Sequence, residues 1–119
     1  MLSNLEICKK ISQIDTPTNK HFDRNGYPLV RDNKTLEWVV FNPFENASQL
    51  QALTKKYKVD AEFLGAGVSA LAHMHLDDDI VVDGLVVFTG SYEKSILCAI
   101  LQLFKRPKLK KYKNLHGII

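Results

Sequence analysis

Apolar residues recur at helical spacing near the start of the chain, over residues 5–14. Ser3 and Glu6 stand at the beginning of this stretch in the positions of a capping box, where their side chains can satisfy the first free backbone N–H groups of a helix. Pro17 pushes the residue before it out of the helical conformation, so the helix should end there. The pattern therefore predicts an amphipathic helix that opens the chain.

Two later stretches have the same period. Asn42 and Asn46 are competing caps for a second helix, which continues to about Tyr57. A third helix covers about residues 90–104, and its second half is apolar on nearly every side, so more than one surface must cover it. The residues of the second helix expected to face the core are Ala47, Leu50, Leu53 and Tyr57.

Short segments between the helices follow the two-residue alternation of β-strands. Residues 27–31 and 35–41 flank a run of turn residues and predict a β-hairpin. Segments 80–82 and 85–88 are continuously apolar, as in strands that are buried on both faces. The strand segments expected after residue 58 are 59–63, 68–74, 80–82 and 85–88.

These elements predict an α+β protein, a small three-layer α/β/α sandwich. We expect the order α-β-β-α-β-β-α, or the same order with a fifth strand, and a mixed or antiparallel sheet with helices on both faces. The 119 residues are enough for one domain with its own core. Residues 1–104 should form this domain, and residues 105–119 should follow it as a basic C-terminal tail.

Charge is unevenly distributed along the chain. The net charge is +3, but the tail has six basic residues and no acidic one, which leaves −3 for residues 1–104. Basic residues beside Tyr112, whose ring could stack on a base, are typical of a nucleic-acid contact. The alternative is a solvated terminus, although the apolar Leu115, Ile118 and Ile119 indicate that part of it packs on this domain or on a partner. The candidate nucleic-acid-binding residues are Lys105, Arg106, Lys108, Lys110, Lys111, Tyr112 and Lys113.

A resemblance to a known family covers roughly residues 36–104. The residues that carry it are Trp38, Phe41-Asn42-Pro43, the helix 46–57 and the closing helix 95–101. They resemble the phage ABA sandwich domain family, although Ala99 stands where members of that family often have an arginine. The resemblance implies a three-layer α/β/α domain carried by phages or prophages. It implies no established activity and transfers no catalytic residues.

His73, His75 and Asp77 would project from one face of a strand. Two imidazoles and a carboxylate can hold zinc or ferrous iron. The stretch is similar to the His-x-His-x-Asp-His motif of metallo-β-lactamase-type hydrolases, but Asp78 replaces the last histidine and 119 residues are too few for that fold. The alternative is an ordinary strand end at a sheet edge. These three residues stay weak candidates, and we expect no metal and no cofactor.

The acidic residues Asp77, Asp78, Asp79 and Asp83 could meet a basic surface on a partner protein. The alternative is solvated loop charge.

Cys8 and Cys98 fall on apolar stripes of predicted helices, where burial disfavours the reactive thiolate. No Ser/His/Asp or Cys/His arrangement can be assembled, so we expect no enzyme. The chain shows no signal-peptide pattern, and its longest apolar run, 96–101, is far shorter than the ~20 residues that span a bilayer. The expected location is the cytoplasm of a host bacterium, away from the membrane.

Together with the small size, the resemblance suggests a non-enzymatic binding protein of phage or prophage type. It would engage and inhibit a host factor, such as a CRISPR nuclease or another defence protein. The alternative is a nucleic-acid-binding accessory protein that acts through the basic tail. A metal-dependent enzyme using the His-x-His-x-Asp stretch is a third hypothesis. A homodimer, formed through the last helix or a hairpin edge, is also compatible with the sequence.

Overall fold

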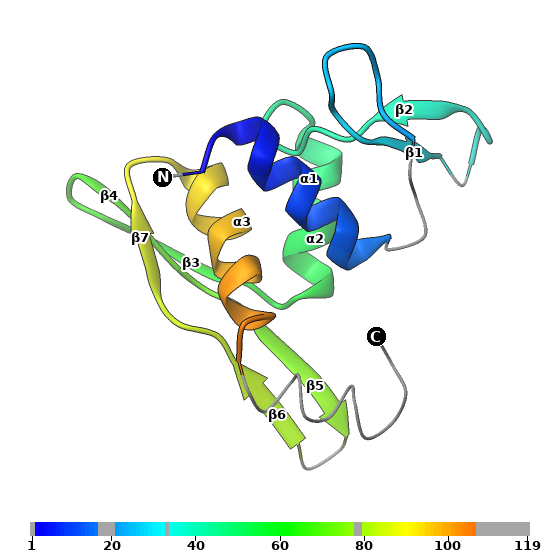
Figure 1. Ribbon diagram of the computed structural model, residues 1–119. Helices are drawn as coiled ribbons and strands as arrows, with labels where there is room; N and C mark the ends of the chain where they lie inside the picture. Colours follow the sequence, from blue (N-terminus) through cyan, green and yellow to red (C-terminus); the bar gives the residue numbers. More distant parts are fainter. Residues whose placement is uncertain (1, 17–20, 33, 78–79, 107–119) are drawn as a thin grey trace. The chain divides into compact units, whose positions relative to one another are not determined.

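The computed structural model describes residues 2–16, 21–32, 34–77 and 80–106. In this part of the chain three helices and seven short strands follow one another, and all strand pairs are antiparallel (Figure 1). The predicted α+β class is therefore confirmed. The chain divides into two compact units, Met1–Ala52 and Leu53–Ile119.

The first helix, α1 (Asn4–Asp15), begins as predicted. The Ser3 hydroxyl accepts a hydrogen bond from the Glu6 backbone N–H, and the Glu6 carboxylate accepts one from the Ser3 backbone N–H, which completes the capping box. Ile7, Cys8 and Ile11 are fully buried. The apolar stripe seen in the sequence is thus the buried face of the helix.

A β-hairpin follows in the first unit, formed by β1 (Leu29–Arg31) and β2 (Trp38–Val40). Both strands are shorter than predicted, because the turn between them takes up more residues. The Asp32 carboxylate accepts hydrogen bonds from the Lys34 and Thr35 backbone N–H groups in the turn, and Leu36 has a positive φ of 62°. Trp38 is 48% exposed, whereas Phe41, just after β2, is buried.

Asn46 is the cap of the second helix, α2 (Ala47–Lys56), which begins in the first unit and ends in the second. Its side-chain oxygen accepts a hydrogen bond from the Gln49 backbone N–H at 3.1 Å. The competing residue, Asn42, instead accepts one from the Phe44 backbone N–H within a preceding turn. The residues buried along the predicted face are Leu50, Leu53 and Tyr57. Ala47 is exposed, so its assignment to the core was wrong.

The second unit contains a sheet in the order β3-β4-β7, formed by β3 (Asp60–Leu64), β4 (Gly67–Leu71) and β7 (Val87–Thr89). A separate hairpin is formed by β5 (His73–Asp77) and β6 (Ile80–Asp83). The sequence predicted one strand over 68–74, but the structure divides it at Ala72. The Ala72 carbonyl accepts a hydrogen bond from the Gly84 backbone N–H, and the chain then changes strand partner.

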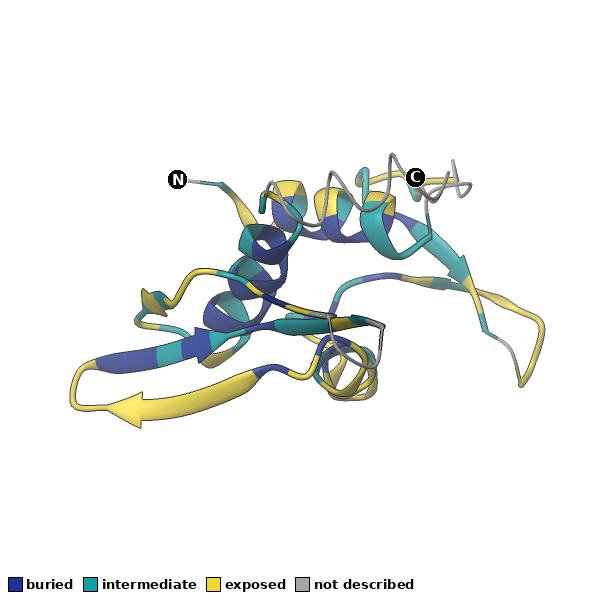
Figure 2. Ribbon diagram, turned by 90° about the horizontal axis from the view of Figure 1, so that it is seen from below, coloured by how far each residue is buried: buried dark blue, intermediate teal, exposed yellow. Residues whose placement is uncertain are grey.

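The last helix, α3 (Tyr92–Leu103), packs on β4 and β7. Ser91 caps it by accepting a hydrogen bond from the Lys94 backbone N–H. Seven of its residues are buried, as its apolar sequence predicts. The strands of the sheet differ in burial: β4 is mostly buried, whereas all five residues of β3 are exposed (Figure 2).

Candidate functional site

Hydrophobic side chains are exposed along β7 and the segment that leads into it. Leu85, Val86 and Phe88 are 53%, 64% and 58% exposed. Phe88 pairs with Ser69 of β4, whose neighbour Val68 is buried on the side of α3. Because successive strand residues point to opposite faces, Phe88 lies on the face of the sheet that α3 does not cover. We call this side of the sheet the open face.

Gly67 and Phe88 approach each other closely on the open face. A Cβ atom on Gly67 would lie 2.6 Å from Cζ of the Phe88 ring and 2.5 Å from the Thr89 carbonyl oxygen, which is too close for any side chain. The glycine therefore leaves the space into which the ring extends. Leu64, the strand partner of Gly67, is 44% exposed.

Two further aromatic rings lie on the side of the sheet that α3 covers, because Phe63 pairs with Val68 and Tyr92 is the first residue of α3. Phe63 and Tyr92 are stacked with parallel planes, and their ring centroids are 5.6 Å apart. Phe63 is 74% exposed, so one side of this stack faces solvent.

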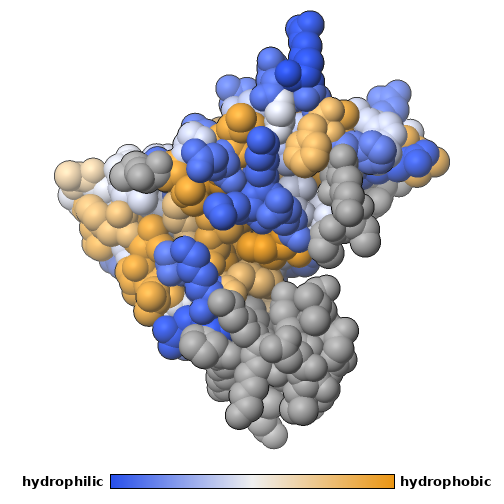
Figure 3. All heavy atoms as spheres, in the orientation of Figure 1, coloured by the Kyte–Doolittle hydropathy of each residue, from blue (hydrophilic) through white to orange (hydrophobic). Residues whose placement is uncertain are grey.

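We call the exposed hydrophobic residues of the open face and of the segment that leads into β7 the aromatic surface: Leu64, Leu85, Val86 and Phe88. Hydrophobic side chains gather over β7 and the neighbouring part of the sheet in the space-filling view (Figure 3). Monomeric proteins rarely expose so many neighbouring apolar side chains unless the surface has a function.

A buried serine fixes β7 beneath this surface. The Ser95 hydroxyl, on α3, donates to the Val68 carbonyl at 2.7 Å and accepts from the Thr89 backbone N–H at 3.2 Å. Val68 and Thr89 are strand partners in β4 and β7, so one side chain joins both strands to the helix. Ser95 is fully buried, which strengthens the effect of these hydrogen bonds.

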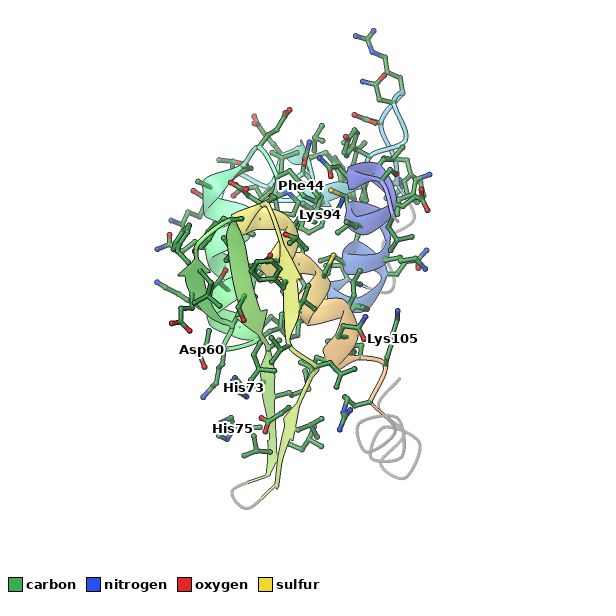
Figure 4. The ribbon with its side chains drawn as sticks, turned by 90° about the vertical axis from the view of Figure 1, so that its left-hand side faces the viewer. Phe44, Asp60, His73, His75, Lys94 and Lys105 are labelled. Atoms are coloured by element: carbon green, nitrogen blue, oxygen red, sulfur yellow. The ribbon has the colours of Figure 1, made fainter. Side chains whose placement is uncertain are left out.

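His73 lies between two carboxylates in the second unit. Its Nδ1 atom is 2.6 Å from Asp83 Oδ1, and its Nε2 atom is 3.1 Å from Asp60 Oδ2. His73 and Asp60 are labelled in Figure 4. The pKa of His73 is raised, chiefly by the hydrogen bond to Asp83. Desolvation of the ring lowers this pKa, and the hydrogen bond to Asp60 raises it further. The three residues join β3, β5 and β6 at one place.

The residues predicted to bind a metal are arranged differently from a metal site. Both ring nitrogens of His73 already face carboxylates, while His75 is exposed two residues further along β5. Asp77 lies in β5, but its side chain is outside the described residues. Within the described ranges, no group of three His, Cys, Asp or Glu side chains is arranged to hold a metal ion.

The predicted acidic and basic contacts lie only partly within the described residues. Asp83 belongs to the cluster with His73, and Asp78 and Asp79 lie outside the described residues. Lys105 is exposed after α3 and Arg106 is half-buried. The tail candidates outside the described residues are Lys108, Lys110, Lys111, Tyr112 and Lys113.

Neither cysteine resembles an activated nucleophile. Cys8 is fully buried, and its burial raises the pKa of the thiol to about 11. Burial also raises the pKa of Cys98, although the nearby charges of Lys94 and Lys105 oppose this shift. Both thiols are therefore protonated at neutral pH, as the sequence predicted.

Two features of the site were missed in the sequence. Segment 85–88 was expected to be buried on both faces, and this was wrong, because only one face of the sheet is covered in the described structure. The contacts of His73 with Asp60 and Asp83 were also missed. Reading residues 73–83 as a hairpin would have placed His73 opposite Asp83, but no local signal points to Asp60.

No family model, no curated protein and no solved structure matches this chain. None of the helices in the described part of the chain is long and apolar enough to cross a membrane.

Proposed function

We propose that this chain is a non-enzymatic binding protein that docks a partner protein through the aromatic surface. The observation that carries the proposal is the exposure of Leu64 and Phe88 on the open face of a sheet whose other face is held to α3 by Ser95. Aromatic side chains on a fixed backbone lose little conformational entropy on binding and commonly dominate interface energies. A rigid sheet with such side chains is therefore well suited to recognise another protein.

The charges beside the aromatic surface favour one kind of partner. Asp60 and Glu62 are exposed on β3, next to the exposed Leu64. The complementary surface would have an apolar centre and a basic margin. Asp83, one of the acidic residues expected to contact a partner, would add to the negative side of this contact.

The resemblance of residues 36–104 to a phage-encoded family supports a partner from the bacterial host. Within this proposal, the chain occupies a surface that the host protein needs for its own activity and so inhibits it. A defence protein such as a CRISPR nuclease is the partner class we favour, on the basis of this resemblance and the small size of the chain.

The test compares wild-type protein with the variant Phe88→Ala as bait in nuclease-treated bacterial lysate. The wild type should capture one protein in stoichiometric amount. Removing the ring should weaken the affinity for that protein about 30-fold, as expected for loss of a hot-spot aromatic worth about 2 kcal/mol.

Phe22→Ala is the matched control, because Phe22 is also about half exposed but lies in the first unit. It should bind as well as the wild type. Equal capture by Phe88→Ala and wild type, or no captured protein in the nuclease-treated lysate, would contradict the proposal. Circular dichroism of both variants shows that a loss of binding does not come from unfolding.

A further inference from the structure

The strand β3 forms one edge of the sheet β3-β4-β7, opposite to the edge formed by β7. In the described part of the chain, no other strand pairs with the outer side of β3. All five of its residues are exposed, and Phe63 is 74% exposed. The N–H and C=O groups along such an edge can pair with a further strand.

The backbone groups that face this edge follow from the turn after β3. The turn has two residues, and the first, Gly65, has a positive φ of 51°, as in a type II′ turn. The residues on either side of such a turn, here Leu64 and Gly67, form a hydrogen-bonded pair. Hydrogen-bonded and non-hydrogen-bonded pairs alternate along an antiparallel ladder, so Ala61 and Phe63 turn their N–H and C=O groups to the outer edge.

An added strand would meet different side chains on the two faces of the sheet. Glu62 pairs with Ser69, so it lies on the open face together with Asp60. On the face that α3 covers, the added strand would lie beside the exposed ring of Phe63, which is stacked on Tyr92. The edge therefore favours a strand in which basic residues alternate with apolar ones.

A second copy of this chain does not suit the edge. Two β3 strands can pair antiparallel through their outer sides with the centre of the pairing at Ala61, Glu62 or Phe63. The first centre places Asp60 opposite Glu62, and the second places Glu62 opposite its own copy, which is destabilising in both cases. The third centre pairs only residues 62–64, because the turn follows. The charges of β3 therefore select a strand from a different protein.

We propose that the outer edge of β3 binds an extended segment of a partner protein in which lysine or arginine alternates with apolar residues. Paired antiparallel, the apolar residues of this segment lie opposite Ala61 and Phe63, bond to their backbone groups and cover the Phe63 ring. The basic residues lie opposite Asp60 and Glu62 in non-hydrogen-bonded pairs, where side chains are closest. This edge is a second surface, and the inference does not rest on the proposed function.

NMR of the full-length protein tests first whether the edge is free. The amides of Ala61 and Phe63 should exchange with solvent at least about tenfold faster than the Glu62 amide, which faces β4. Slow exchange of Ala61 and Phe63 at every protein concentration would overturn the proposal, because the chain would then occupy its own edge. Slow exchange that appears only at high concentration would also overturn it, because a second copy would then do so.

The probe for binding is the hexapeptide Lys-Val-Lys-Val-Lys-Val with blocked ends, added at up to about 5 mM. It should shift the amide resonances of Ala61 and Phe63 in a saturable manner. The same peptide with N-methylated valines cannot donate hydrogen bonds to β3 and should bind at least about tenfold more weakly. Unshifted resonances at Ala61 and Phe63, or equal binding of the methylated peptide, would refute strand addition.

A charge exchange separates recognition by the edge from general attraction to a basic peptide. Glu62→Lys should bind the lysine peptide about fivefold more weakly than the wild type and should prefer the peptide in which glutamates replace the lysines. Phe63→Ala should also weaken binding of the lysine peptide about fivefold. The matched control Glu37→Lys, the same charge change at an exposed residue of the first unit, should bind like the wild type. Equal effects of Glu62→Lys and Glu37→Lys, or unchanged binding by Phe63→Ala, would contradict the proposal.

Discussion

Replacing Ser95 by alanine removes a buried side chain that joins α3 to two strands of the sheet. The hydroxyl donates to the Val68 carbonyl and accepts from the Thr89 backbone N–H, and it also lies 2.6 Å from the Thr89 hydroxyl. The substitution removes no apolar packing atoms, so its effect measures this hydrogen-bond network almost alone. Helix propensity slightly favours alanine, which works against the predicted loss.

The size of the effect follows from the groups left behind. A buried backbone group that loses its hydrogen bond costs about 1–3 kcal/mol. The Ser95→Ala variant leaves two backbone groups, the Val68 carbonyl and the Thr89 N–H, without their hydrogen-bond partner. Because Val68 and Thr89 are strand partners, these two groups can move toward each other and recover part of the loss. We therefore expect a loss of about 2 kcal/mol in the free energy of unfolding. For a chain of this length, this corresponds to a decrease of about 8 °C in the melting temperature.

Urea unfolding followed by circular dichroism measures this loss, and Ser69→Ala is the matched control. Ser69 is on β4 like Val68, but its side chain is on the open face and only half-buried. Its removal should change the free energy of unfolding by less than about 0.5 kcal/mol. If Ser95→Ala were no less stable than Ser69→Ala, the role given to the Ser95 hydroxyl would be refuted.

The acid–base prediction concerns His73, whose pKa is raised above its ordinary value of 6.5, chiefly by the hydrogen bond to Asp83. The folded state binds this proton more tightly than the unfolded state, so the stabilisation is complete below about pH 6.5 and is lost as pH rises through the raised pKa. His73→Gln should therefore lower the free energy of urea unfolding more at about pH 6 than at about pH 9. An equal loss at both pH values would contradict the conclusion that protonated His73 is stabilised by Asp60 and Asp83. Leu36→Gly should raise the melting temperature, because glycine adopts the positive φ of this position without strain; the expected gain in the free energy of unfolding is about 1 kcal/mol. Leu36→Ala should give no gain. An equally stable or less stable glycine variant would contradict the conclusion that the backbone is strained at Leu36.

The helices were predicted well because their signals are local. The capping box of Ser3 and Glu6, the cap Ser91 and the apolar stripes are each complete within a few residues. The strands were predicted less well because a strand depends on its partner. β4 ends before Ala72, and the His73 backbone N–H then donates a hydrogen bond to the carbonyl of Tyr57, which is distant in the sequence. No residue near Ala72 indicates this change of partner.

The candidate site was harder to predict, because the sequence does not state what covers a strand. An apolar segment such as residues 85–88 has the same composition whether it is buried within the chain or exposed for a partner. Only the sheet order and the position of α3 show that Val86 and Phe88 are exposed. The His73 cluster likewise depends on strand register, since Asp60 and Asp83 are 13 and 10 residues away.

The contact between Gly67 and Phe88 has two physical explanations, and the surrounding residues distinguish them. A glycine within a strand weakens the sheet, and an aromatic ring from the neighbouring strand can compensate by shielding it. That explanation requires one ring on the open face and accounts for Phe88 alone. It does not explain why Val86 and Leu85 are also exposed. Docking of a partner on this surface explains their exposure as well, and the Phe88 ring, seated on a glycine, is already held in one orientation before binding.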